Sequence, residues 1–184
     1  RTCGSTSAIP REIIFTSRSD DRYGAGGTFD TNADGDAQTP GPGDWGGLYV
    51  GPIGSASIDH ALLTFGGGVT KIEGTFKAFN ILEIHQADVR VAHSVIEYNA
   101  NGQGGQGPFD RYGRSYNEPA TIYVRGAQPI LVNNTIQHND DVALSINANS
   151  FTSDTVPDTG RSTGLLDLAG DFSSNTGPLI RGNV

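Results

Sequence analysis

The sequence predicts an all-β chain that folds as a right-handed parallel β-helix, a solenoid with three short strands in each coil. The main observation is an irregular repeat: 95–99 (VIEYN) recurs as 135–139 (TIQHN), with a looser copy at 62–66 (LLTFG). Constant strands separated by variable lengths are typical of a solenoid whose coils carry insertions. Composition is the second observation, because 26 Gly, 9 Pro and only 17% charged residues are typical of turn-rich β proteins.

The first strand of each coil is predicted at four similar triplets. They are 48–50 (LYV), 82–84 (LEI), 122–124 (IYV) and 144–146 (LSI). Neighbouring side chains of a strand point to opposite faces, so we expect the outer residues of each triplet in the core and the middle one in solvent. The outward residues are then Tyr49, Glu83, Tyr123 and Ser145.

The second and third strands follow from the same alignment. The second strands share one inward apolar residue, at Ile58, Val91, Leu131 and Ile180. The third strands share Leu63, Ile96 and Ile136, with 13–15 (IIF) as a partial predecessor. Parallel stacking places equivalent residues about 4.8 Å apart. Asn99 and Asn139 should therefore stack and bond the neighbouring backbone, at about 1 kcal/mol per hydrogen bond.

The four first-strand triplets give about four coils, with a minimum period of about 22 residues, in a single domain over residues 1–184. The chain begins at Arg1 without a methionine, and its tail 178–184 repeats the start of 129–135 in mid-coil. We therefore expect a part of a longer protein, in which further coils or neighbouring subunits cover the open end. The single cysteine, Cys3, provides no internal disulfide framework.

Four insertions lengthen the coils. Those at 18–44, 66–79 and 100–119 connect a third strand to the next first strand, and 147–177 connects a first strand to a second. We expect them to wall the face that presents Tyr49, Glu83 and Tyr123, which is the predicted ligand face. Two insertions share the tetrapeptide Asp-Arg-Tyr-Gly, at 21–24 and 110–113, which predicts a repeated turn with an Asp–Arg pair.

Residues 30–36 (DTNADGD) have the spacing of a calcium loop, in which alternate side chains converge and a glycine permits the sharp turn. The predicted ligands are Asp30, Asn32, Asp34 and Asp36, with Asp20, Asp21 and Asp44 near enough in sequence to complete the shell. Gly41 stands where an EF-hand has its bidentate Glu, so an EF-hand is not predicted. The alternative is a loop rich in Asx turns that holds no ion.

Two further motifs raise the questions of a catalytic pair and of a metal pair. The segment 139–144 (NDDVAL) resembles the paired-Asp strand of polygalacturonase-like β-helix hydrolases, in which Asp140 and Asp141 would act as acid and base. The other motifs of that family have no match in this chain. His60 and His93 align on adjacent coils, but no Cys or carboxylate shares their level in the alignment, so a zinc site is not predicted.

A wider resemblance rests on 13–17 (IIFTS), 20–21 (DD), 30–35 (DTNADG) and 42–48 (PGDWGGL). Together they resemble a block of large secreted or surface-attached bacterial β-helix proteins: a strand ending F-T-S, an acidic loop, then P-G-D-W-G-G. The resemblance implies the fold and an extracellular or cell-surface location. It implies no single activity, because such proteins include adhesin-like, structural and sugar-processing members. Trp45 is expected to pack its loop onto the coil.

The charge and hydropathy narrow the expected partners. A net charge of -8 with only two lysines argues against nucleic acid, and no apolar run approaches the roughly 20 residues of a membrane helix. We therefore expect a non-catalytic extracellular module for adhesion, spacing or filament assembly, with a calcium-ordered loop and a polysaccharide or cell-surface glycan as candidate partner. The alternative is a polysaccharide lyase or glycoside hydrolase acting on the ligand face.

Overall fold

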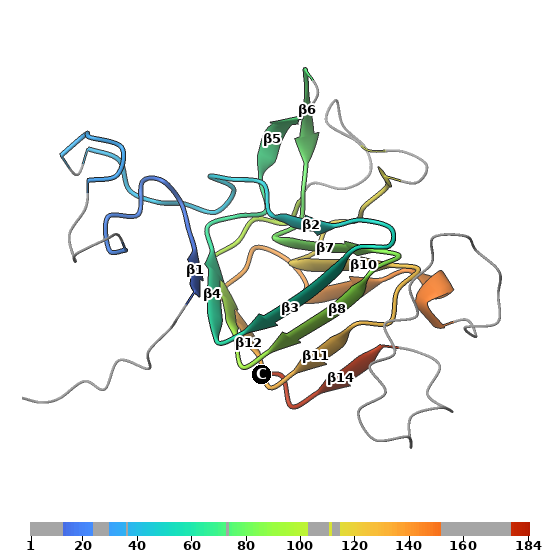
Figure 1. Cartoon of the computed structure of the whole chain (residues 1–184). Helices are drawn as coiled ribbons and strands as arrows, with labels where there is room; N and C mark the ends of the chain where they lie inside the picture. The colour runs from blue at the N-terminus through green and yellow to red at the C-terminus, as the bar shows by residue number, and fades with distance from the viewer. Residues whose placement is uncertain are drawn as a thin grey trace, which may run out of the picture.

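The computed structural model is all-β, with three four-stranded parallel sheets and one antiparallel hairpin (Figure 1). It describes residues 13–23, 30–35, 37–72, 74–102, 111, 115–151 and 178–184. The first sheet contains β2 (Leu48–Val50), β7 (Leu82–His85), β10 (Ile122–Arg125) and β13 (Leu144–Ile146). The second contains β3 (Ser55–Asp59), β8 (Asp88–Ala92), β11 (Ile130–Val132) and β14 (Leu179–Arg181). The third contains β1 (Ile13–Phe15), β4 (Ala61–Thr64), β9 (Val95–Glu97) and β12 (Thr135–Gln137).

The strand registers confirm the alignment predicted from the repeat. In the first sheet Glu83 pairs with both Tyr49 and Tyr123. In the second sheet Val91 pairs with Ile58 and Leu131, and the third sheet has the corresponding pairs around Ile96. The chain passes from the first sheet to the second and the third three times in succession. The all-β class and the parallel stacking are therefore confirmed, and the arrangement is compatible with a β-solenoid.

The inward side chains of the three sheets form one apolar core. Ile84, Val91, Ile96 and Val124 are all fully buried in it, and each comes from a different strand. Burying one such side chain contributes roughly 1.5–3 kcal/mol to folding. Trp45 packs against the same core, and its indole N–H donates to the carbonyl of Thr64 at 2.9 Å. The insertion 18–44 is thereby anchored to the sheets.

Ten corners between the sheets are turned by a residue with positive φ, and these residues recur at equivalent places from coil to coil. The corners after the first-sheet strands use Ile53, Gln86 and Gly126. Those after the second-sheet strands use His60, His93, Asn133 and Gly182, and those after the third-sheet strands use Phe65, Tyr98 and His138. This conformation costs roughly 1–2 kcal/mol for a residue other than glycine. The stacked rings of neighbouring coils offset part of that cost, as at Tyr98 and His138, whose centroids are 5.2 Å apart.

Two ladders of side-chain amides run across the coils. The predicted stack is confirmed: the Asn99 side chain accepts from Gly66 N at 2.8 Å and donates to Asn139 Oδ1 at 3.0 Å. A second ladder was not predicted, and it joins Ser94, Asn134 and Asn183 at the start of the third-sheet strands. Its amide oxygens accept the backbone N–H groups of the preceding coil at 2.9–3.0 Å.

The bases of three insertions lie side by side. Gly43 N donates to Gly66 O at 3.1 Å, and Gly102 N donates to Gly67 O at 3.0 Å. A Cβ on Gly68 would stand 1.9 Å from Gly43 O, so this close backbone contact requires glycine. The insertion 66–79 also contains a hairpin that was not predicted, formed by β5 (Val69–Ile72) and β6 (Thr75–Ala78).

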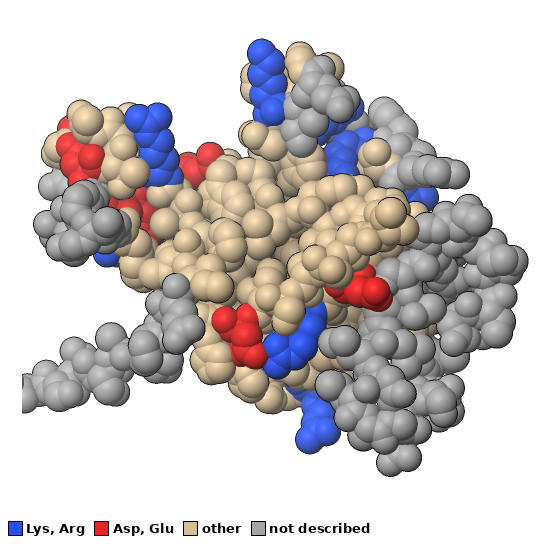
Figure 2. Space-filling view, in the orientation of Figure 1, with Lys and Arg blue, Asp and Glu red and all other residues tan. Residues whose placement is uncertain are grey.

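One further element is a short 3-10 turn. This turn, η2 (Ala148–Phe151), begins the insertion 147–177, of which 152–177 lies outside the described residues. None of the helical segments in the described part of the chain is long and apolar enough to cross a membrane. Figure 2 shows acidic side chains gathered at the end of the molecule that carries the insertion 18–44, beside a largely uncharged sheet surface.

Candidate functional site

The outward face of the first sheet differs from the prediction. Glu83 and Tyr123 were expected in solvent, yet their exposed fractions are 0% and 1%, whereas Tyr49 on the outer coil is 44% exposed. The expectation of solvent exposure is wrong for the two central residues. The physical reason is that residues of the insertions lie over this face, with Phe79 edge-on to Tyr49 and Arg111 against Glu83.

Glu83 is held in a buried polar cluster. Arg111 Nη1 lies 2.5 Å from Glu83 Oε2, His85 Nε2 lies 2.9 Å from Oε1, and Asn80 N donates to Oε2 at 3.3 Å. The Arg111 guanidinium also stacks on the Phe79 ring, 4.4 Å from its centroid. A buried carboxylate requires a charged partner and hydrogen bonds of this kind. Glu83 therefore has no exposed surface with which to contact a ligand.

The repeated tetrapeptide supplies an arginine to each of two buried carboxylates. Arg22 pairs with Asp20, at 2.7 Å from Nε to Oδ1, and not with Asp21 of its own tetrapeptide. Arg111 pairs with Glu83, and Asp110 lies outside the described residues. The predicted Asp–Arg pair within the tetrapeptide is therefore wrong for the first copy. The carboxylate of Asp20 is fully buried beside the positively charged guanidinium group of Arg22. It also accepts a hydrogen bond from Thr16 Oγ1 at 2.5 Å.

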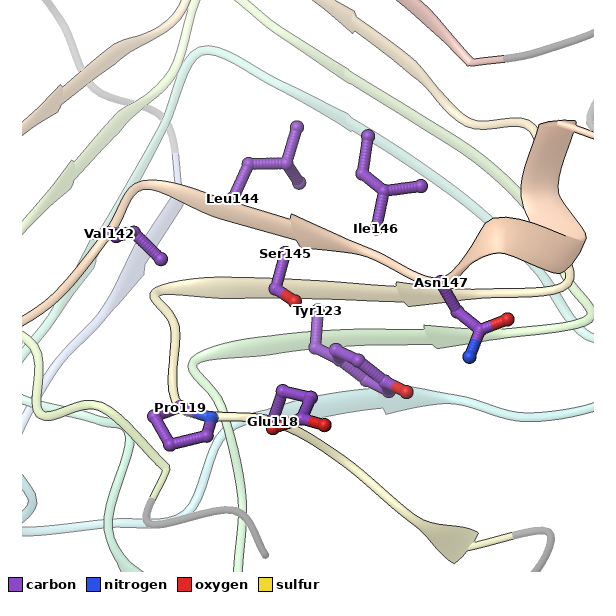
Figure 3. A pocket seen from close by; sticks show the side chains of 8 residues that line it. All are labelled: Glu118, Pro119, Tyr123, Val142, Leu144, Ser145, Ile146 and Asn147. Atoms are coloured by element: carbon purple, nitrogen blue, oxygen red, sulfur yellow. The ribbon is translucent and has the colours of Figure 1, made fainter.

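Beyond Tyr123 the same face opens into a cavity of about 500 Å³, here called the β13 cavity. It is lined by Glu118, Pro119, Tyr123, Val142, Leu144, Ser145, Ile146 and Asn147. Figure 3 shows the Ser145 side chain on the same side of the sheet as Tyr123 and Asn147, with Leu144 and Ile146 on the opposite side. Burial raises the pKa of the Tyr123 phenol. The alternation along β13 thus directs a hydroxyl into the cavity.

The chemistry of the β13 cavity favours binding. Its walls supply the carboxylate of Glu118, the amide of Asn147 and the hydroxyl of Ser145, which together donate to and accept from a ligand rich in hydroxyls. Tyr116 Oη donates to Glu118 Oε1, which fixes that carboxylate. Cleavage of a glycosidic bond by the usual route requires two carboxyl groups flanking the bond. Among the described lining residues, Glu118 is the one carboxylate.

The alternative catalytic pair is not among these lining residues, although Asp141 directly precedes Val142, which is one of them. Asp140 and Asp141 are exposed in the connection between β12 and β13. Asp141 Oδ1 accepts from Val142 N at 2.7 Å, and Asp140 N donates to Asn99 O at 2.9 Å. Neither residue lines the β13 cavity. Both therefore occupy a hydrogen-bonded turn at the end of the amide ladder.

The acidic loop brings part of the predicted calcium set together. Carboxylate oxygens of Asp21, Asp30 and Asp34 lie within 4.8 Å of one another. Asp30 also accepts from Asp34 N and Gly35 N, both at 2.7 Å. Asn32 Nδ2 donates to Asp34 Oδ2 at 2.9 Å, and Asn32 Oδ1 is buried with no hydrogen-bond partner among the described residues. Carboxylate and amide oxygens are the ligands that calcium prefers.

The remaining predicted ligands are placed elsewhere or lie outside the described residues. Asp20 is paired with Arg22, as described above. Asp44 accepts from Ser17 Oγ at 2.5 Å and from Gly41 N at 3.0 Å, which closes the base of the insertion. Asp36 lies outside the described residues.

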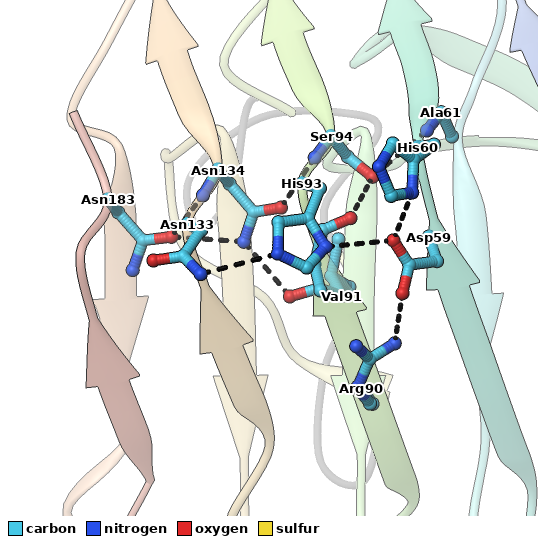
Figure 4. A network of polar contacts seen from close by, with 11 residues as sticks. Asp59, His60, Ala61, Arg90, Val91, His93, Ser94, Asn133, Asn134 and Asn183 are labelled. Atoms are coloured by element: carbon cyan, nitrogen blue, oxygen red, sulfur yellow. Dashed lines mark hydrogen bonds and ion pairs between the residues drawn. The ribbon is translucent and has the colours of Figure 1, made fainter. Parts of the chain in front are cut away.

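A third polar cluster was missed by the sequence reasoning. Figure 4 shows Asp59 between His60 and His93 at the corner that follows β3 and β8. A carboxylate therefore does share the level of the two histidines, contrary to the expectation from the alignment. The hydrogen bond from His93, followed by that from Arg90, lowers the pKa of Asp59 to about 2. The available signal in the sequence was Asp59, which directly precedes His60, one of the two aligned histidines.

Comparisons of this chain with models of known protein families, with curated proteins and with solved structures give no match.

Proposed function

We propose that this chain is a non-catalytic module of an extracellular right-handed parallel β-helix that binds a glycan in the β13 cavity and serves adhesion. The observation that carries the proposal is the composition of the cavity, which combines hydrogen-bonding groups of several kinds with a single described carboxylate. The resemblance of 13–17, 30–35 and 42–48 to large secreted or surface-attached bacterial β-helix proteins supports the location.

The right-handed coil is supported by the order in which the chain visits the sheets. β2 and β7 are parallel neighbours in one sheet, and the chain between them runs through the other two sheets. Connections between parallel strands of the same sheet are almost always right-handed, because a right-twisted strand packs its crossover back on the sheet in that sense. The same argument applies to β7 and β10.

Strand edges support the proposed spacing and assembly roles. In the described part of the chain, β13 and β14 stand at the edges of their sheets, and Ile180 of β14 is 44% exposed. An open edge offers unpaired backbone groups to another strand. We propose that further coils of a longer chain, or neighbouring subunits, pair with these edges.

Calcium is proposed as the ion that orders the insertion 18–44. Two observations support this assignment: the three convergent carboxylates, and the buried Asn32 oxygen that has no hydrogen-bond partner among the described residues. At millimolar calcium and a dissociation constant of about 0.1–1 mM, the ion would stabilise the fold by roughly 1–2 kcal/mol. Its role in this proposal is to order a loop and not to take part in catalysis.

The test is affinity electrophoresis through gels that contain individual acidic and neutral polysaccharides. Ser145→Arg places a large side chain in the β13 cavity, and Ser57→Arg places the same side chain on the exposed face of β3 as a matched control. The proposal expects one class of polysaccharide to retard the wild type and Ser57→Arg but not Ser145→Arg. Equal retardation of all three, or of none, would contradict it.

The same samples separate binding from cleavage. Release of reducing ends or of unsaturated products, abolished by Asp140→Ala combined with Asp141→Ala, would replace the proposal with the lyase or hydrolase alternative. If the protein binds no polysaccharide and electron micrographs show fibres that form as the protein concentration rises, filament assembly would be favoured instead.

A further inference from the structure

The corner that joins the second sheet to the third brings three metal-binding side chains together at the surface. Asp59 ends β3, the outermost strand of the second sheet, and His60 follows it in the corner; His93 occupies the equivalent corner of the next coil. The two histidines have φ of 54° and 50°, so both backbones turn in the same way. Their rings consequently stack, with centroids 4.9 Å apart and an interplanar angle of 28°.

The three donor atoms lie close together. Asp59 Oδ1 is 2.5 Å from His60 Nδ1 and 3.0 Å from His93 Nδ1. A tetrahedral zinc ion with ligand distances of 2.0–2.1 Å requires ligand atoms about 3.3 Å apart. All three side chains are between 38% and 55% exposed. The donor atoms can therefore move apart by less than about 1 Å, to the separation that zinc requires, without repacking of the core.

We propose that Asp59, His60 and His93 form a surface site for a divalent transition-metal ion of the zinc class. Two imidazole nitrogens and one carboxylate oxygen are a common ligand set for zinc, and they leave a fourth position for water or for a group on another molecule. The ligand set does not suit calcium, which prefers oxygen ligands alone. This site is separate from the acidic loop.

Two neighbours modulate the proposed site. Asn133 Nδ2 lies 3.3 Å from His93 Nε2 on the side away from Asp59. When His93 Nδ1 binds an ion, Nε2 carries the proton, so the Asn133 amide must turn its Oδ1 toward this nitrogen to accept from it and fix the orientation of the ring. Arg90 Nη1 lies 2.7 Å from Asp59 Oδ2 and competes with the ion for the carboxylate charge. Removal of Arg90 should therefore strengthen metal binding.

The chain contains a matched control for the two histidines. His138 is also exposed, has a φ of 53° and stacks on the ring of Tyr98 in the corner after the third sheet. Replacing any of the three by Gln therefore imposes a similar backbone strain. His138 differs in that it is not among the clustered ligand residues.

The experiment is isothermal titration of the purified chain with Zn²⁺ alone, with Co²⁺ absorption as a second readout of tetrahedral ligation. Cys3 is alkylated beforehand, and millimolar Ca²⁺ is present to reduce zinc binding by the acidic loop. The inference expects one zinc ion per chain, bound at least about tenfold more weakly by His60→Gln and His93→Gln. His138→Gln should match the wild type, and Arg90→Gln should bind about twofold to fivefold more tightly.

Circular dichroism and thermal melts of each variant show whether the fold is retained. Zinc affinity in folded His60→Gln and His93→Gln equal to that of the wild type would overturn the inference. An equal loss in His138→Gln would overturn it as well, because binding would then not depend on the cluster. Absence of stoichiometric binding to the folded wild type would do the same.

Discussion

Arg111 and Glu83 form a buried ion pair, with Nη1 2.5 Å from Oε2, between an insertion and the central part of the first sheet. The side chains are 5% and 0% exposed. The pair covers the part of the sheet that the strand pattern alone would leave in solvent. It thereby confines the accessible cavity to β13 and the residues beside it.

Arg111→Met should destabilise the protein by about 3–5 kcal/mol, because it leaves the Glu83 carboxylate buried without a cationic partner. Combining Arg111→Met with Glu83→Gln should recover part of that loss, since the uncompensated charge is then removed. Urea unfolding of the single and double variants measures both effects. Equal stability of Arg111→Met and the wild type would show that the pair does not form in solution.

Asn99→Ala should lower the free energy of unfolding by about 3 kcal/mol. The side chain accepts from Gly66 N and donates to Leu63 O and Asn139 Oδ1, and each bond contributes about 1 kcal/mol. Gln137→Ala is the control, because Gln137 is exposed on the neighbouring coil and its loss should change stability by less than about 0.5 kcal/mol. Similar losses in the two variants would contradict the ladder.

The buried phenol of Tyr123 should ionise later than an ordinary tyrosine. Burial raises the pKa of Tyr123 and that of Tyr49. A pKa raised by folding contributes stability that is full below about pH 10, the unfolded value, and is lost as the pH rises through the folded value. Absorbance at the phenolate band should show a late phase that shrinks in Tyr123→Phe. An unchanged late phase in that variant would contradict the burial.

Calcium should raise the melting temperature by about 2–8 °C relative to a chelated sample, the shift that roughly 1–2 kcal/mol produces in a chain of this size. Asn32→Ala should remove most of the shift, because it deletes the amide oxygen that has no partner among the described residues. Asp140→Ala, at an exposed acid elsewhere, should retain it. An identical melting temperature with and without calcium in the wild type would exclude the ion from the loop.

The registers of all three sheets were predictable because each coil repeats the same short strands. For Glu83 the strand pattern predicted the face of the sheet but not the burial. Its alternation with Leu82 and Ile84 placed it outward correctly, but Arg111, which covers it, lies 28 residues later in an insertion of unrelated sequence. A period-2 pattern assigns a face and contains no information on what lies over that face.

The candidate sites show the same division between local and distant signals. The acidic spacing of residues 30–34 was visible because calcium ligands alternate along the chain. The pairing of Asp59 with His60 and His93 depends on corners with positive φ, a conformation that sequence patterns rarely reveal for histidine. The hairpin of β5 and β6 had a signal in Gly74 between two alternating runs, which was not used.

The central claim is that the first-sheet face binds a glycan in the β13 cavity without cleaving it. The most direct measurement is a crystal structure of the chain with the oligosaccharide that binds most tightly in the polysaccharide panel. An intact oligosaccharide is expected between Glu118 and Asn147, over Ser145 of the first sheet. A cleaved product in the cavity, or an oligosaccharide bound elsewhere with the cavity empty, would contradict it.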